Sequence, residues 1–110
     1  GVPDRLRGVR VEVSGGVTRP PMEPIAASRR LLAAYEPYAA ASGLKTGEAE
    51  LQGGGSDANL LVALGVPCID GLGPFGEYFH QVREWCSLAS LKARTAALAW
   101  FLAEQASGFE

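Results

Sequence analysis

The sequence predicts an α/β fold in which short strands alternate with helices. Two long stretches carry apolar side chains at intervals of three and four residues, one over about 24–42 and one of about twenty residues after Ser87. Short alternating or apolar segments occupy residues 8–14, 46–52 and 66–70. The order strand, helix, strand, helix, strand, loop, helix is typical of an α/β layer, in which ligands bind beyond the carboxyl ends of the strands.

Composition limits the class of protein. The 110 residues are 47% hydrophobic, which suits one core and leaves no room for two domains of ordinary size. A formal net charge of −2 argues against a nucleic-acid partner or an anionic membrane surface. Because no apolar run is long enough to span a bilayer and no leader is present, we expect a cytoplasmic protein. The chain starts at Gly1 and its only methionine is Met22, so we expect that it is not an intact translation product.

The first predicted element is a strand over Gly8–Ser14. Its valines alternate with Arg10 and Glu12, which is the pattern of a half-buried strand with one wet face. Gly15 and Gly16 end it, and Thr18–Pro21 should be extended because each proline keeps its predecessor out of the helical region. We place a domain edge at this point.

The second element is a helix that starts near Pro24, runs to about Ser42 and ends at Gly43. Pro37 should kink or split it, because proline lacks an N–H and clashes with the preceding turn. Arg29 and Arg30 should be exposed. The apolar stripe consists of Ile25, Leu31, Leu32, Tyr35 and Tyr38.

A glycine-rich turn, Gly53–Asn59 (GGGSDAN), follows the weak strand at 46–52. Ser56 and Asp57 look like an N-cap pair for a short helix, Asn59–Leu64, which Gly65 ends. Bare N–H groups before a helix favour an anion site. A flexible surface turn with an ordinary cap explains the same residues.

The carboxy-terminal half reads as a buried parallel strand, a loop and a helix. Val66–Asp70 is the strand, Gly71–Gly76 begins the loop, and Ser87 caps the last helix. Cys68 and Cys86 have no framework spacing, so we expect reduced, buried thiols. The last helix should bury Leu88, Leu91, Leu98, Phe101 and Leu102 and expose Lys92, Arg94 and Glu104.

Three residues are candidates for chemistry. His80 is the only histidine, and since a zinc site needs several protein ligands, any others must lie on another segment; a lone histidine is also often structural. Arg19 is held in a stiff stretch and suits a carboxylate, or is a solvated hinge residue. Asp70 ends a strand and either acts in catalysis or caps the following turn.

Taken together, these motifs resemble a known family. GGVTRPPME, then GGGSDANLLVALGVPCIDGLGP, then His80 followed shortly by Glu84-Trp85, are similar to the carboxy-terminal part of zinc-dependent metallo-amidohydrolases. These are the glutamate carboxypeptidase, acetylornithine deacetylase and aminoacylase family. The resemblance covers nearly the whole chain from Val9.

The resemblance implies a fold and a set of roles. Residues 1–18 would end a lid or dimerisation domain with its last strand, and 19–110 would form the second half of a three-layer α/β catalytic domain with a mixed or mostly parallel sheet. His80 would be a ligand of a two-metal site holding zinc, or cobalt or manganese. Arg19 and the backbone of Gly54, Gly55 and Ser56 would hold a substrate carboxylate.

The resemblance also implies what this chain lacks. The other metal ligands and the glutamate general base of the family precede the lid, so no catalytic residue is assigned here and the chain alone should be inactive. Its partners would be a small carboxylate-bearing substrate, the rest of its catalytic domain and a second copy through the lid. The run Gly76–Phe79 is bulkier than the family's usual one, and Gln81–Arg83 departs from the usual turn. A non-catalytic carboxylate-binding domain and a fold-completing domain remain alternatives.

Overall fold

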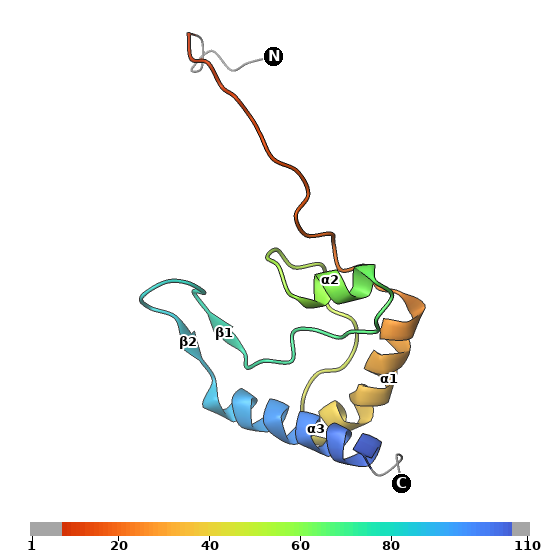
Figure 1. Ribbon diagram of the computed structural model, residues 1–110. Coiled ribbons are helices and arrows are strands. Elements are labelled where there is room, and N and C mark those ends of the chain that lie inside the picture. The colour runs from red at the N-terminus through yellow and green to blue at the C-terminus, as the bar shows by residue number, and fades with distance from the viewer. Residues whose placement is uncertain (1–7, 107–110) are drawn as a thin grey trace.

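The computed structural model describes residues 8–106 and combines three helices with a small sheet (Figure 1). The sheet is antiparallel and pairs Gly76 with Cys86 and Glu77 with Trp85. This mixture of helix and sheet is compatible with part of an α/β domain. The elements are α1 (Ala26–Ala41), α2 (Ala58–Ala63), β1 (Gly76–Glu77), β2 (Trp85–Cys86) and α3 (Leu88–Ala106).

Helix α1 forms where the sequence predicts it. It ends at Ala41, and Gly43, two residues further on, has a φ of 74°, the left-handed conformation that glycine adopts without strain. The N–H groups of Gly43 and Leu44 donate to the carbonyls of Ala40 and Ala39, which is the Schellman pattern of helix termination. Pro37 lies inside α1 without splitting it.

The buried core lies between α1 and α3. Tyr35 and Ala39 of α1 pack with Ala97 and Phe101 of α3, and the rings of Tyr35 and Phe101 meet edge to face at 5.8 Å. Edge-to-face geometry is the favoured contact between aromatic rings. Partly buried neighbours complete the cluster: Leu31, Tyr38, Leu44, Ile69, Leu72 and Leu98.

The prediction for α3 was right about its cap and only partly right about its buried face. The Ser87 Oγ accepts the Ser90 N–H at 3.2 Å, as an N-cap does. The small Ala97 is fully buried because it lets α1 approach closely, and Phe101 is buried beside it. Four predicted positions differ from expectation: Leu88, Leu91 and Leu102 are exposed, and Arg94 is half-buried.

Three predicted strands are not strands in this structure. Residues 8–14, 46–52 and 66–70 carry no ladder pairing within the described residues, and the sheet is the β1–β2 hairpin alone. A strand needs a neighbour for its N–H and C=O groups. The segment at 8–14 nevertheless keeps the alternation of a strand, since Arg10 and Glu12 form an exposed ion pair on one side.

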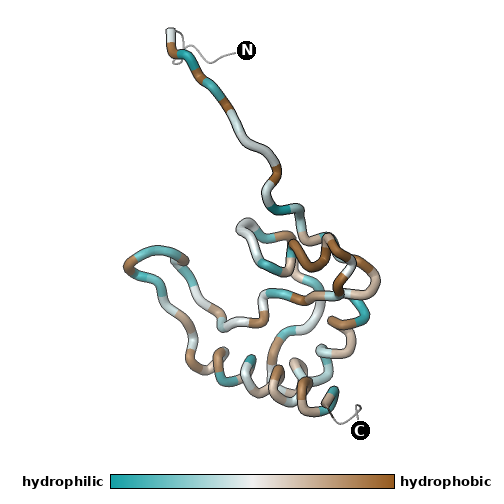
Figure 2. Tube along the Cα trace, viewed as in Figure 1, coloured by the Kyte–Doolittle hydropathy of each residue, from teal (hydrophilic) through white to brown (hydrophobic). Residues whose placement is uncertain are grey.

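The N-terminal segment that begins at residue 8 projects away from the helices (Figure 1). Hydrophobic residues (brown) and hydrophilic residues (teal) alternate along it (Figure 2). The radius of gyration is 19.4 Å, against about 13 Å for a compact domain of 100 residues. Much apolar surface is therefore exposed, including Val13 at 93% and Leu51 at 90%. Within residues 8–106, no helix is long and apolar enough to cross a membrane.

The domain division predicted at residue 18 stays a prediction, and its first seven residues lie outside the described part of the chain. Both cysteines are free, as predicted. The expectation that both are buried was wrong, because Cys86 is exposed on β2 and Cys68 is half-buried.

Candidate functional site

Arg19 lies directly against the glycine-rich turn. A Cβ on Gly55 would come within 3.2 Å of the Arg19 Cδ, so the absence of a side chain at Gly55 makes room for the arginine stem. The Arg19 Nη1 lies 3.2 Å from the Asp57 Oδ1. We call Arg19, Gly54, Gly55, Ser56 and Asp57 the Arg19 site.

A small hydrogen-bond network fixes this turn to the segment that carries Arg19. The Asn59 side-chain amide donates to the Pro20 carbonyl at 2.8 Å, and its Oδ1 accepts the Ser56 N–H at 3.0 Å. The Ser56 Oγ accepts the Ala58 N–H at 3.2 Å. Ser56 and Asn59 therefore cap α2 reciprocally, in the manner of a capping box. Asp57 occupies the N-cap position of α2, as predicted, but its carboxylate makes no cap hydrogen bond and lies against Arg19 instead.

The charges of the Arg19 site lie near solvent. The Arg19 side chain is 39% exposed and the Asp57 side chain 93% exposed. An exposed ion pair of this kind contributes at most about 1 kcal/mol, so an incoming carboxylate can compete with Asp57 for the guanidinium. The Arg19 guanidinium pairs with the Asp57 side chain of the same chain, and its predicted contact with a substrate carboxylate stays a prediction.

His80 lies in the loop between β1 and β2, residues 78–84, which we call the His80 loop. Both Tyr78 and His80 have left-handed backbone conformations, with φ of 62° and 63°. The His80 N–H donates to the Glu84 Oε2 at 3.1 Å, and the Arg83 guanidinium lies 4.0 Å above the centre of the Tyr78 ring. His80 itself is exposed.

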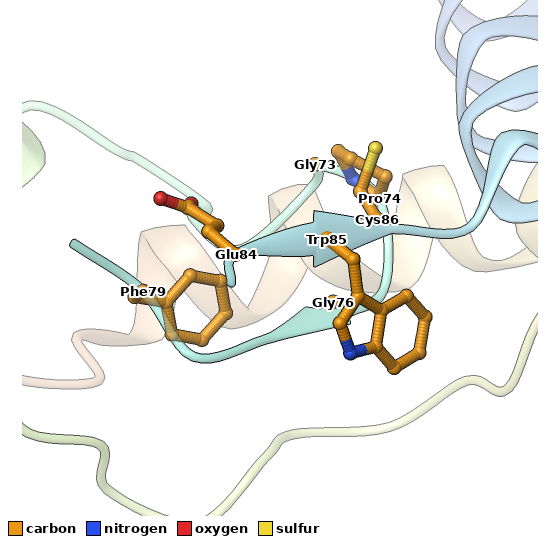
Figure 3. Close-up of a pocket in the computed structure, with 7 residues that line it drawn as sticks. All are labelled: Gly73, Pro74, Gly76, Phe79, Glu84, Trp85 and Cys86. Atoms are coloured by element: carbon orange, nitrogen blue, oxygen red, sulfur yellow. The ribbon is translucent and has the colours of Figure 1, made fainter. Parts of the chain in front are cut away.

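An open groove of about 490 Å³ runs beside the hairpin (Figure 3). The Phe75 and Trp85 rings meet edge to face at 5.7 Å next to it, which stiffens the base of the hairpin. The residues that line it are Gly73, Pro74, Gly76, Phe79, Glu84, Trp85 and Cys86. The groove adjoins the His80 loop and includes no residue of the glycine-rich turn.

The structure assembles the Arg19 site and leaves His80 apart from it. The His80 loop and α2 lie on separate arms of the molecule (Figure 1), so within the described residues the glycine-rich turn and the His80 loop do not share one crevice. Asp70 is exposed, and no hydrogen bond of its carboxylate occurs within residues 8–106, so its predicted capping role was wrong.

The described residues offer few of the ligands that a metal ion requires. The exposed imidazole of His80 suits one ligand position. The part of the chain that the structure describes contains no group of three or more histidine, cysteine, aspartate or glutamate side chains that could hold a metal ion. Within residues 8–106, His80 could therefore fill one position of a metal site only if further ligands came from elsewhere.

Comparison with protein families places the chain. Residues 5–104 match the family described as Peptidase family M20/M25/M40. The chain belongs to this family. Comparison with curated proteins and with solved structures gave no match. Membership of the M20/M25/M40 peptidases supports a metallopeptidase-type hydrolase, and peptidases of this family generally use divalent metal ions. It confirms the broad resemblance predicted from the motifs.

Sequence reasoning missed the structural role of Asn59 in this M20/M25/M40 chain. Its side chain joins the turn to Pro20, and this contact spans 39 positions of sequence. The signal was the spacing of Ser56 and Asn59, three residues apart at a helix start, which is the spacing of a capping box.

Proposed function

We propose that this chain provides the carboxylate-binding residues and one metal ligand of an amidohydrolase or exopeptidase. Within the peptidase family, its group would be that of the glutamate carboxypeptidases, acetylornithine deacetylases and aminoacylases. The substrate would be an N-acyl amino acid or small peptide with a free carboxylate. The observation that supports this is the position of the Arg19 guanidinium, which lies against Gly55 and pairs with the Asp57 carboxylate at 3.2 Å.

Arg19 and the backbone of the turn would both contact the substrate carboxylate. The guanidinium presents a planar fork that suits a carboxylate in two-point contact. The backbone of Gly54, Gly55 and Ser56 lies beside it without bulky side chains to obstruct an anion. Fixing the carboxylate at one end orients the amide bond at the other, which contributes through proximity and alignment.

His80 would hold one metal ion through its imidazole. When bound, two divalent ions, zinc or alternatively cobalt or manganese, would polarise the amide carbonyl and activate a water molecule. Because the described residues offer His80 without companion ligands, the other ligands and the general base would come from the rest of the catalytic domain. The chain alone would then be inactive.

The proposal extends to architecture. Residues 19–110 would be the second half of a three-layer α/β catalytic domain, and residues 1–18 the end of a lid domain that pairs two copies. The unpaired segments at 8–14, 46–52 and 66–70 support this, since each has the sequence of a strand and lacks a neighbour in the described residues. We place the protein in the cytoplasm.

The test is Arg19→Lys in the enzyme that contains this chain, with Arg30→Lys as control. Arg30 is exposed on α1. Lysine keeps the charge and loses the planar fork, so kcat/KM for an N-acyl amino acid should fall roughly ten- to a hundredfold. His80→Ala should lower it further. An Arg19→Lys enzyme with unchanged kcat/KM on all carboxylate substrates would contradict the proposal.

A second candidate is a carboxylate-binding domain without catalysis. It is favoured by the finding that residues 8–106 contain no group of metal-ligating side chains. The two functions differ in the role of His80. If His80→Ala left carboxylate binding intact and no hydrolysis were found in any longer form of the protein, the binding domain would be the better description.

A further inference from the structure

The His80 loop adopts a conformation that needs an explanation. Non-glycine residues with φ near +60° are uncommon, because the side chain crowds the backbone. Two such residues, Tyr78 and His80, flank Phe79 in this loop. Residues held this way persist only where their surroundings determine them, and they concentrate at functional positions.

The short hairpin cannot impose this conformation. Strands β1 and β2 are two residues each, and their ladder ends at the pair of Glu77 and Trp85. Backbone hydrogen bonds inside the loop form successive turns: the Gln81 N–H donates to the Tyr78 carbonyl at 3.1 Å, and the Glu84 N–H to the Gln81 carbonyl at 3.0 Å. These turns do not involve the His80 N–H.

The His80 N–H is bound by a carboxylate instead. It donates to the Glu84 Oε2 at 3.1 Å, four residues further along the chain. A hydrogen bond to an ionised acceptor is stronger than one between neutral groups. The Glu84 side chain leaves the chain on the side opposite to Trp85, toward the loop (Figure 3). Arg83 also contributes to the conformation of the His80 loop, because its guanidinium contacts the ring of Tyr78 at the start of the loop.

We propose that Glu84 is the positioning residue of His80. Its carboxylate holds the His80 backbone in the left-handed conformation, and this fixes the direction from which the imidazole leaves the loop. The consequence for metal binding rests on the proposed function, whereas the conformational role does not. Partners that orient a ligand matter because their loss commonly lowers metal affinity about ten- to a hundredfold.

Three variants test the assignment. Glu84→Ala removes the acceptor, Glu84→Gln keeps an acceptor oxygen at the same reach, and Glu77→Gln neutralises a neighbouring exposed glutamate on β1 as control. The first readout is the hydrogen-exchange rate of the His80 amide in the 110-residue chain, measured by NMR. The second is the Zn²⁺ dissociation constant of the enzyme that contains this chain, measured by competition with a chelator.

We expect Glu84→Ala to speed exchange at His80 by roughly fivefold, with amides of the α1–α3 core unchanged. We expect it to weaken Zn²⁺ binding about tenfold. Glu84→Gln should restore most of both values, and Glu77→Gln should change neither. An unchanged His80 amide in Glu84→Ala would overturn the proposal, as would a Glu84→Gln variant no better than Glu84→Ala.

The two proposals fail separately. If His80→Ala binds Zn²⁺ as tightly as the wild-type enzyme, His80 is not a metal ligand and the proposed function is wrong in that respect. The exchange of the His80 amide still decides whether Glu84 positions the loop, because that readout needs no metal.

Discussion

Gly55→Ala offers a direct test of how Arg19 is held. The added Cβ would lie 3.2 Å from the Arg19 Cδ, 3.6 Å from its Nε and 3.7 Å from its Nη1. Favourable contacts between carbon atoms start at about 3.5 Å, so the arginine stem must move by a few tenths of an ångström. The displaced arginine keeps its positive charge, but its guanidinium is no longer aligned with a bound carboxylate. If that forfeits about 1 kcal/mol of a two-point contact with a carboxylate, affinity falls roughly fivefold.

Gly53→Ala is the matched control. A Cβ at Gly53 would meet nothing within 4 Å, and neither Gly53 nor Gly55 has a left-handed backbone, so both substitutions are free of backbone strain. The assay is titration of the labelled chain with N-acetylglutamate, following the Arg19 Nε and the amides of the turn by NMR. Equal affinities for the Gly55→Ala and wild-type chains would refute the reasoning, and so would an equal loss in Gly53→Ala.

Three further predictions concern the rest of the chain. Gly76→Ala should open the hairpin at a cost of roughly 1–3 kcal/mol, because its Cβ would lie 2.3 Å from the Trp85 carbonyl oxygen. Loss of cross-strand NMR contacts would show this. Gly73→Ala, whose Cβ would meet nothing within 4 Å, should keep those contacts. Tyr35→Phe should leave the free energy of unfolding in urea unchanged or raise it by up to about 1 kcal/mol, since the buried Tyr35 hydroxyl has no hydrogen-bond partner among residues 8–106. A clear loss of stability would mean that the hydroxyl does have a hydrogen-bond partner. The exposed segment at 9–14 should drive self-association detectable by sedimentation, because an unpaired strand edge invites a second copy; a monomer with slowly exchanging amides there would contradict this.

Local signals predicted the helices well. Gly43 and Gly65 were identified as stops, and each is left-handed at the end of its helix. Ser87 was identified as a cap for the same kind of reason, since a short hydroxyl side chain satisfies a free N–H. These features depend on a few neighbouring residues, so the sequence contains all the information that determines them.

Features that depend on distant partners were not predictable in this way. The valines of 9–13 have the alternation of a strand, yet pairing requires a second chain segment that the described residues do not supply. The buried face of α3 is centred on Ala97 rather than on the leucines, because contact with α1 decided which side turned inward. Helical periodicity shows that a face exists and leaves the choice of neighbour open.

The candidate site shows the same division. Arg19 and the glycines were predicted to bind an anion, which stays a prediction, and the structure places Arg19 against Gly55 and Asp57. The role of Glu84 depends on the left-handed backbone of His80, which residue preference alone does not predict, because few non-glycine residues adopt it even though histidine does so more often than most.

Helix α1 connects the two halves of the candidate site. The Cys68 N–H donates to the Ser28 Oγ on α1, beyond the end of α2, and the Phe101 ring of α3 packs on Tyr35 of the same helix. At the other end of α3, the hairpin is tied down through Phe75, whose carbonyl accepts the Ser87 N–H and whose N–H donates to the Ser90 Oγ.

Each functional segment therefore has its own structural link to α1. Because Ala97 is fully buried where α3 packs on α1, a larger side chain there would force the two helices apart and displace the hairpin relative to the glycine-rich turn.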